Sequence, residues 1–273
     1  MSATGTGDPT TALTGARIFS GERTVEGHAV LIGDGLIVDV VPEERIPSTA
    51  ARHALGGGLL APGFVDCQVN GGGGVMFNHA PGVDGIRTIA AAHRRFGTTG
   101  LLPTLITDGP GTIPKAIDAV RDAIAAGVPG VLGIHIEGPF INVERKGAHD
   151  PALIRVPGPD DVAALKSLAV GRTLVTLAPE NMPGGVIADL ATAGVLVAAG
   201  HTAASYEQTR AALAAGVTGF THLFNAMTPL GSRAPGVVGA ALDDPDSWCG
   251  LIVDGVHVHA TTLRLAIAVK RRG

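Results

Sequence analysis

The chain has 273 residues and a formal net charge of −4 at pH 7, and it lacks the basic clusters that mark a nucleic-acid-binding surface. Apolar residues make up 45% of the chain, yet no apolar run approaches the length of a membrane span. The first residues, MSATGTGDPTTALTG, do not have the charged start and apolar stretch of a signal peptide. These features predict a soluble cytoplasmic protein that binds neither nucleic acid nor a membrane.

The first regular pattern begins near residue 11. Residues 1–10 are expected to be a disordered lead-in, whereas residues 11–60 contain short apolar strands separated by Gly-Asp turns, TALTGARIFSG and HAVLIGDGLIVDVVP. The turn Gly33-Asp34-Gly35 between two apolar runs indicates a β-hairpin. We interpret residues 11–60 as a small β-sandwich module.

After Pro62, apolar strands alternate with helical stretches. The predicted strands are GFVDCQVNG, TGLLPTLIT, VLGIHIEG, RTLVTLAPE, VLVAAGHT, GFTHLFNAM and WCGLIVDGVHV. The predicted helices are VDGIRTIAAAHRRFG, TIPKAIDAVRDAIAAG, DDVAALKSLAV, GGVIADLATAG, SYEQTRAALAAG and TTLRLAIAVKRRG. This alternation of strands and helices over residues 61–273 implies an α/β fold with a parallel sheet, either an open doubly wound sheet or a (β/α)8 barrel of TIM type.

The polar residues of the predicted strands favour the barrel. Nearly every strand carries its unusual polar residues at the C-terminal end: Gln68, Asn70, Thr104, Glu137, Glu180, His201, His222, Asp254 and His257. In a barrel these ends converge on one mouth, where the active sites of this fold lie. An open sheet gathers such residues at one switch point instead. The sequence therefore predicts a barrel with seven of its eight strands present.

Two cysteines lie in the predicted strands. Cys67 and Cys249 are too few for a disulfide framework, and both occupy apolar segments. We expect them to be buried free thiols in a reducing cytosol.

Three of the strand-end residues form a candidate metal site. Glu137, His201 and His222 follow the third, fifth and sixth predicted strands. Taken singly, a strand-end histidine is more often a hydrogen-bonded pocket residue, and a glutamate before Gly-Pro could cap a helix. Together, one carboxylate and two imidazoles at one mouth predict a mononuclear metal site with a position open for water. His135, deeper on the same face, is expected to support Glu137, with ligation as the alternative.

Several motifs in order resemble one family. PGFVDCQVNGGGG, GIHIEGPFINVERKGAHDP, VTLAPE, AAGHT, THLFNAM and VDGVHV are similar to those of N-acetylglucosamine-6-phosphate deacetylases, of the amidohydrolase superfamily. The resemblance implies hydrolysis of N-acetylglucosamine 6-phosphate to glucosamine 6-phosphate and acetate, as in amino-sugar catabolism. A deacetylase for another N-acetylhexosamine phosphate, such as the galactosamine isomer, remains an alternative.

The metal count follows from a departure within these motifs. Many relatives in the wider superfamily have His-x-His at the end of the first strand, where this chain has Gln68 and Asn70. Neutral amides are poor ligands for zinc-like ions, and the fourth strand offers no lysine for a bridging carbamate. We therefore expect one divalent ion, zinc or iron.

The resemblance also implies roles in substrate binding. His149 and His257 would contact the sugar and the acetamide carbonyl, with His257 polarising that carbonyl. Asn225, the Ala226 backbone N–H and Arg233 would hold the phosphate. In the family such an arginine can serve a neighbouring subunit, which implies a homodimer. Outside the family, Arg233 would read as a solvated loop charge, and Asn225 as a helix cap.

The general acid/base is the exception. In the family this role belongs to an aspartate at the end of strand eight, whereas Asp254 belongs to the predicted strand seven. We expect this aspartate to be absent from the chain, which reads as truncated before the last barrel strand. A non-catalytic remnant that binds metal or sugar phosphate is therefore the second alternative.

Overall fold

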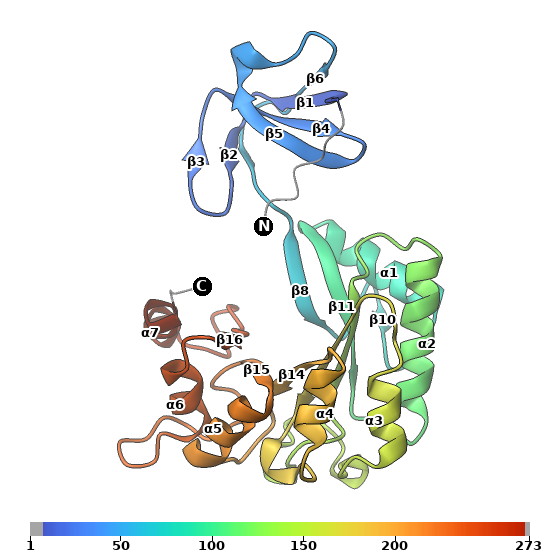
Figure 1. Cartoon of the computed structure of the whole chain (residues 1–273), viewed down its shortest axis with the longest axis vertical. Coiled ribbons are helices and arrows are strands. Elements are labelled where there is room, and N and C mark those ends of the chain that lie inside the picture. The colour runs from blue at the N-terminus through green and yellow to red at the C-terminus, as the bar shows by residue number, and fades with distance from the viewer. Residues whose placement is uncertain (1–7, 271–273) are drawn as a thin grey trace. The chain divides into compact units, whose positions relative to one another are not determined.

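The computed structural model describes residues 8–270, and the chain divides into two compact units with the boundary in the sequence between Phe64 and Val65. Most of the expected disordered lead-in, residues 1–7, lies outside the described residues. Figure 1 shows both units, coloured along the chain. No helix in the described part of the chain is long and apolar enough to cross a membrane.

The first unit consists of two small sheets. One has the order β5-β4-β1-β6 and the other the order β3-β2-β7. Their bounds are β1 Thr11–Thr14, β2 Arg17–Phe19, β3 Thr24–Val25, β4 His28–Gly33, β5 Leu36–Pro42, β6 Ala51–Ala54 and β7 Leu59–Leu60, with a 3-10 turn η1 at Glu43–Arg45. Asp34 and Gly35 both have positive φ, 51° and 75°, as a two-residue hairpin turn between β4 and β5 requires. The predicted hairpin is confirmed.

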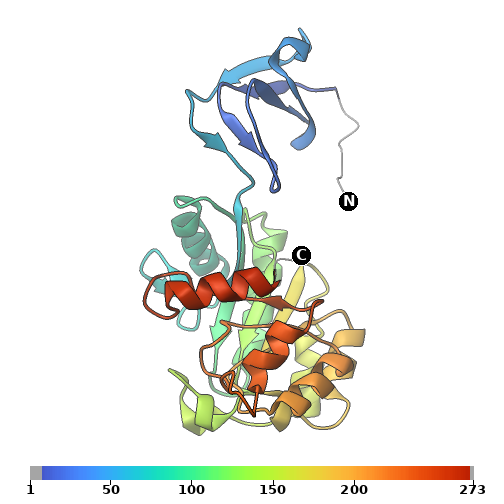
Figure 2. The same ribbon diagram turned by 90° about the vertical axis from the view of Figure 1, so that its left-hand side faces the viewer.

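The second unit is built on a curled sheet of seven strands. Their order is β8-β11-β12-β13-β14-β15-β16, and the recorded pairings from β11 to β16 are parallel. The bounds are β8 Phe64–Val69, β11 Thr98–Ile106, β12 Gly133–Glu137, β13 Arg172–Leu177, β14 Leu196–Ala199, β15 Val217–Phe220 and β16 Trp248–Cys249. A small hairpin, β9 Gly71–Gly72 with β10 Val75–Met76, follows β8. The sheet forms a half-barrel whose edges are β8 and β16, as Figures 1 and 2 show.

Helices connect the strands and cover the outside of the half-barrel (Figure 1). They are α1 Val83–Arg94, α2 Thr112–Ala125, α3 Pro159–Leu165, α4 Val186–Thr192, α5 Tyr206–Ala215, α6 Gly236–Asp243 and α7 Ala260–Lys270. Three 3-10 turns, η2 Val143–Arg145, η3 Pro151–Leu153 and η4 Pro179–Asn181, lie in the loops. The sequence pattern does not predict α6, because this helix is buried on nearly all sides and has no polar face to give a period.

Strand β12 shows how the sheet separates core from site. Ile134 and Ile136 pack in the main core with residues of the helices, such as Ile117 of α2. Because side chains alternate along a strand, His135 and Glu137 point to the opposite, inner face of the sheet. On that inner face Leu102, Leu174 and Ala198 form a separate apolar cluster, and polar residues lie beyond it toward the strand ends.

Two predictions fail at the sheet edges. The seventh predicted strand, WCGLIVDGVHV, runs to Val258, but β16 ends at Cys249, since its partner β15 ends at Phe220 and gives no further ladder. Asp254 and His257 therefore lie in a loop instead of at a strand end. Cys67, expected to be buried, is exposed on the edge strand β8, and Cys249 is half-buried. Burial raises the pKa of the Cys249 thiol to about 11.

An ion pair beside α3 yields a stability prediction. Arg155 lies over the Phe140 ring and donates from both terminal nitrogens to the Asp161 carboxylate, one of them at 2.6 Å. The backbone N–H of Gly158 donates to the same carboxylate at 2.9 Å. The Arg155 guanidinium, as the largest cause, lowers the pKa of Asp161.

We expect Asp161→Asn to lower the free energy of unfolding by about 1 kcal/mol at pH 7, since the pair is partly exposed and screened. A carboxyl with a depressed folded pKa stabilises the fold fully above its unfolded pKa of about 3.9, and this contribution disappears as the pH falls through the folded pKa. The difference between wild type and variant, measured by urea unfolding, should therefore shrink between pH 7 and pH 3. A constant difference over this range would contradict the assignment.

Candidate metal centre

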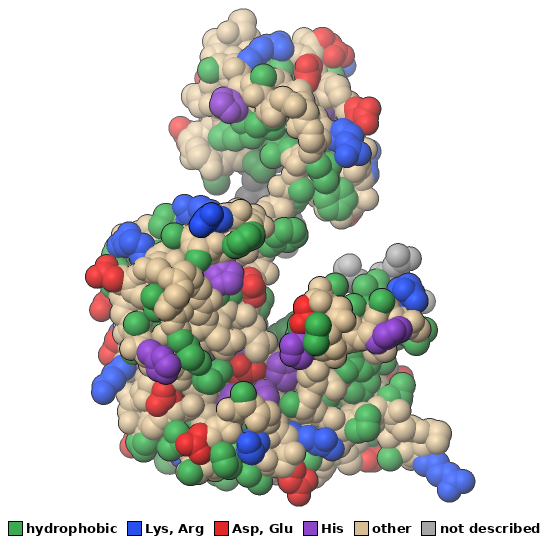
Figure 3. Space-filling model, turned by 180° about the vertical axis from the view of Figure 1, so that it is seen from behind, with side chains coloured by type: hydrophobic (Ala, Val, Ile, Leu, Met, Phe, Trp, Pro, Cys, Tyr) green, Lys and Arg blue, Asp and Glu red, His purple; other side chains and the backbone are tan. Residues whose placement is uncertain are grey.

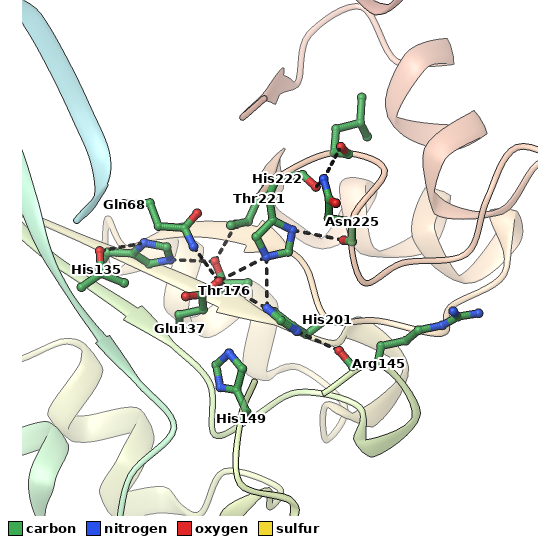
Figure 4. A network of polar contacts seen from close by, with 12 residues as sticks. Gln68, His135, Glu137, Arg145, His149, Thr176, His201, Thr221, His222 and Asn225 are labelled. Carbon is green, nitrogen blue, oxygen red and sulfur yellow. Dashed lines mark hydrogen bonds and ion pairs between the residues drawn. The ribbon is translucent and has the colours of Figure 1, made fainter. Parts of the chain in front are cut away.

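Glu137, His201 and His222 meet at the C-terminal ends of the strands. Glu137 is the last residue of β12, and the two histidines follow β14 and β15 by two residues each. His222 Nε2 lies 3.0 Å from His201 Nε2 and 3.2 Å from Glu137 Oε1, and His201 Nε2 lies 3.4 Å from the same oxygen. All three side chains are buried, and Figure 4 shows them converging. The structure thus brings together the residues that the sequence nominated as metal ligands.

The backbone at this point is bent in an unusual way. His201 and His222 have positive φ values of 49° and 37°, and Phe224 and Ala226, which follow, have values of 80° and 51°. Such conformations are uncommon for residues other than glycine and tend to cluster at functional sites, where the surrounding contacts hold them. The bends let both imidazoles turn back from their strand ends toward Glu137.

The hydrogen bonds of the two rings fix their tautomers. His201 Nδ1 lies 2.8 Å from the carbonyl oxygen of Arg145, and His222 Nδ1 lies 3.1 Å from the carbonyl oxygen of Asn225. A carbonyl oxygen can only accept, so both Nδ1 atoms carry the proton and donate it. In its neutral form each ring then has its lone pair on Nε2, and both Nε2 atoms face the carboxylate oxygen. Backbone carbonyls that orient ligating histidines in this way are typical of metal sites.

Three converging lone pairs repel one another unless a cation lies between them. Ligand atoms about 2.1 Å from a tetrahedral zinc ion are separated by about 3.4 Å. The three observed separations of 3.0, 3.2 and 3.4 Å are close to this value. One carboxylate oxygen and two imidazole nitrogens at these separations fit a divalent ion.

Gln68 has a role that the sequence did not reveal. Gln68 lies near the C-terminal end of β8, and its side-chain amide nitrogen donates to Glu137 Oε1 at 2.8 Å (Figure 4). Because a carboxylate can only accept, the amide NH2 must face Glu137. Gln68 therefore holds the candidate ligand Glu137 in position, whereas the sequence alone indicated only an amide in the place of a ligating histidine. Its place at the strand end was the available signal.

His135 lies behind the cluster. It is fully buried, its Nε2 lies 2.7 Å from Thr176 Oγ1, and Thr176 Oγ1 lies 2.6 Å from Thr221 Oγ1. Burial is the main cause that lowers its pKa to about 4, so the ring is neutral near pH 7. Among the described residues, the group of possible ligand atoms comprises Glu137, His201 and His222 without His135. This placement agrees with a supporting position, and its role remains a prediction.

The two histidines that the family motifs imply for substrate binding differ in burial and in the side chains that they contact. His149 is buried beside the cluster, with its ring centre 4.5 Å from that of His201 and its Nδ1 2.7 Å from Thr107 Oγ1. Burial, followed by the His201 ring, lowers the pKa of His149 to about 4. His257 is exposed, and its Nδ1 donates to Asp254 at 2.6 Å.

The phosphate candidates lie on the loop between β15 and α6. Asn225 does not cap α6, whose N-cap is Pro235, and its backbone carbonyl instead orients His222. Arg233 is exposed on this loop, and no ion pair of its guanidinium is recorded with any of residues 8–270.

A cleft of about 700 Å³ opens between the edge strands β8 and β16 and reaches the cluster. Its polar lining includes Asp66, Gln68, Asn70, His135, His222 and Asp254. Figure 3 shows a hollow with histidine and acidic side chains at its bottom. The candidate metal centre is thus reachable from solvent.

Two family models match this chain. The model described as NagA composite domain covers residues 11–60, and the model of the amidohydrolase family covers residues 59–272. The chain belongs to the amidohydrolase family, whose members are metal-dependent.

Its relatives within that family carry deacetylase names. An N-acetylgalactosamine-6-phosphate deacetylase from a Shewanella species is 42% identical over 247 residues, which is 90% of this chain and 63% of the relative. An N-acetylglucosamine-6-phosphate deacetylase from Haemophilus influenzae is 36% identical and covers 95% of this chain and 68% of the relative.

A crystal structure of N-acetylglucosamine-6-phosphate deacetylase from Pasteurella multocida superposes with a TM-score of 0.90 at 36% identity, covering 95% of this chain and 69% of that one. The resemblance inferred from the motifs is confirmed, and the chain spans about two thirds of the length of these relatives.

Proposed function

We propose that the protein is a metal-dependent deacetylase that hydrolyses the acetamide of N-acetylglucosamine 6-phosphate to glucosamine 6-phosphate and acetate. The observation that carries the proposal is the convergence of His201 Nε2, His222 Nε2 and Glu137 Oε1, with both Nδ1 protons donated to backbone carbonyls. The names of the relatives support this reaction class.

The cluster would hold one divalent ion, zinc or iron, through Glu137, His201 and His222. When bound, such an ion supplies a Lewis acid that makes a water nucleophilic near neutral pH. Two imidazoles and one carboxylate suit either metal. Gln68 and Asn70 offer neutral amides, and Gln68 already donates to Glu137, so a second ion is not part of the proposal.

The substrate would be held by residues around the cleft. His257, oriented by Asp254, would polarise the acetamide carbonyl, and His149 would contact the sugar. Asn225, the Ala226 N–H and Arg233 would bind the phosphate, for which a guanidinium offers a bidentate fork.

Three features beyond the site belong to the same proposal. The curled seven-stranded sheet would be part of a (β/α)8 barrel, as the fold of the relatives suggests. The exposed Arg233 loop would serve a second subunit in a homodimer. A cytoplasmic location would suit Cys67 and Cys249, which are free thiols.

The test is an acetate-release assay with the metal-loaded protein. We expect acetate and amino-sugar phosphate in equal amounts from N-acetylglucosamine 6-phosphate, and none after treatment with a chelator. Sugar-phosphate binding without acetate release would contradict the proposal and favour a non-catalytic binding role.

One observation favours a second substrate. The Shewanella relative, at 42% identity, is named for the galactosamine isomer. Both epimers should therefore be assayed side by side, because they differ only in one hydroxyl configuration. A kcat/KM higher for N-acetylgalactosamine 6-phosphate would move the assignment to that sugar.

A further inference from the structure

The Glu180 carboxylate accepts hydrogen bonds from several segments beside the candidate metal centre. It lies in η4, directly after β13, and accepts three hydrogen bonds from two other loops. Asn142 Nδ2 donates to Oε1 at 2.9 Å, the Ala203 backbone N–H donates to Oε1 at 2.6 Å, and the Thr202 hydroxyl donates to Oε2 at 2.5 Å. Glu180 is not one of the candidate ligand residues in the described cluster.

These contacts suit an ionised carboxylate. A carboxylate can only accept, so Asn142, Ala203 and the Thr202 hydroxyl all donate to it, while the Thr202 oxygen accepts the Ala204 N–H at 3.1 Å. A glutamine has one acceptor oxygen for Asn142 and Ala203 and would turn its NH2 toward Thr202, which would then have to accept, so the three charge-assisted hydrogen bonds would be lost. No lysine, arginine or histidine within residues 8–270 forms an ion pair with Glu180, so charge pairing with a cation does not explain it.

These bonds hold His201 from both sides. Thr202 and Ala203 directly follow His201, whose φ of 49° is a conformation that needs external support. On the other side, Asn142 donates its backbone N–H to the His201 carbonyl at 2.8 Å and caps η2, the turn that presents the Arg145 carbonyl to His201 Nδ1. One carboxylate therefore fixes both the backbone of His201 and the acceptor that sets its tautomer.

We infer that Glu180 is a positioning residue for the metal centre, which acts by holding the His201 Nε2 lone pair on the metal position. The inference rests on the proposed metal site and adds to it a residue outside the ligand set. Contacts that orient a ligating histidine typically change metal affinity by roughly 10- to 100-fold when they are lost.

The central experiment compares wild type with Glu180→Gln, which keeps the size of the side chain. We expect zinc to bind the variant roughly 10- to 100-fold more weakly in competition with a chromophoric chelator. The visible absorption bands of the cobalt-substituted variant should also shift, because they report ligand geometry. An unchanged zinc affinity together with an unchanged cobalt spectrum would overturn the inference.

Three further variants separate positioning from general stability. Thr202→Val removes one donor to Glu180 and should weaken zinc binding, whereas Thr202→Ser keeps the hydroxyl and should restore it. Asp161→Asn removes a multiply bonded carboxylate beside α3, and it should lower the melting temperature without changing zinc affinity. If Asp161→Asn weakens zinc binding as much as Glu180→Gln, the effect comes from stability and the inference fails.

The variants also decide the outcome if Glu180→Gln does not fold. In that case equal zinc affinities of Thr202→Val and Thr202→Ser would overturn the inference, and a weaker Thr202→Val would support it. A wild-type protein that binds no metal would overturn the proposed metal site as well. If the wild type binds zinc and the Glu180 and Thr202 variants bind it with the same affinity, only the role of Glu180 would be overturned.

Discussion

His201→Ala is expected to abolish stoichiometric metal binding. The change removes one of three ligand atoms and leaves Glu137 and His222, which cannot enclose an ion by themselves. Losing a ligand should weaken affinity by more than the roughly 10- to 100-fold that follows from losing a residue that only orients one. Elemental analysis of protein purified without chelator should find about one divalent ion per wild-type chain and almost none in the variant.

Thermal unfolding gives an independent measurement of the same change. An ion that binds only the folded state stabilises it by about 2.7 kcal/mol at a free concentration one hundred times the Kd. Added zinc should therefore raise the melting temperature of wild type and leave that of His201→Ala unchanged.

A matched control for this variant is His53→Ala. His53 lies exposed on β6 of the first unit, outside the cluster, so its loss should not affect the metal. Two tightly held ions in wild type would contradict the one-metal assignment. Unchanged metal content in His201→Ala would remove His201 from the site.

The features that could be predicted from the sequence are periodic or local. Alternation in VLGIHIEG separated Ile134 and Ile136 from His135 and Glu137, and the structure confirms this separation. Position after a strand was enough to nominate His201 and His222, because parallel strands end at one edge. These signals depend on a few neighbouring residues, which a single sequence contains.

What could not be predicted depends on contacts between distant segments. Gln68 and Glu137 are 69 positions apart, and their hydrogen bond follows from the pairing order of the strands. The acceptor for His222 is the carbonyl of Asn225, which depends on the positive φ values of this loop. Exposure of Cys67 likewise reflects the position of β8 at a sheet edge, which its apolar sequence does not reveal.

Arg233→Ala is expected to remove most of the preference for a phosphorylated sugar. Under the proposed function, wild type should hydrolyse N-acetylglucosamine 6-phosphate with a kcat/KM roughly 30- to 1,000-fold above that of free N-acetylglucosamine, since a charge-assisted phosphate contact contributes about 2–4 kcal/mol. In the variant this ratio should fall, mainly because kcat/KM for the phosphorylated substrate falls. Arg94→Ala is the matched control, because Arg94 is an exposed arginine at the end of α1. Equal efficiency of wild type on both sugars would refute phosphate recognition.

Under the proposed homodimer, mixing Arg233→Ala with His201→Ala shows which subunit Arg233 serves. Its guanidinium has no recorded ion pair with the described residues of its own chain, as expected if its partner is a phosphate bound at another subunit's site. In a mixed dimer of Arg233→Ala with His201→Ala, one site would then combine an intact His201 with an Arg233 from the second chain. A preference for the phosphorylated sugar that reappears on mixing would establish action between subunits. Mixtures that keep the low preference of Arg233→Ala would place Arg233 at the site of its own chain, because every site would then lack one of the two residues.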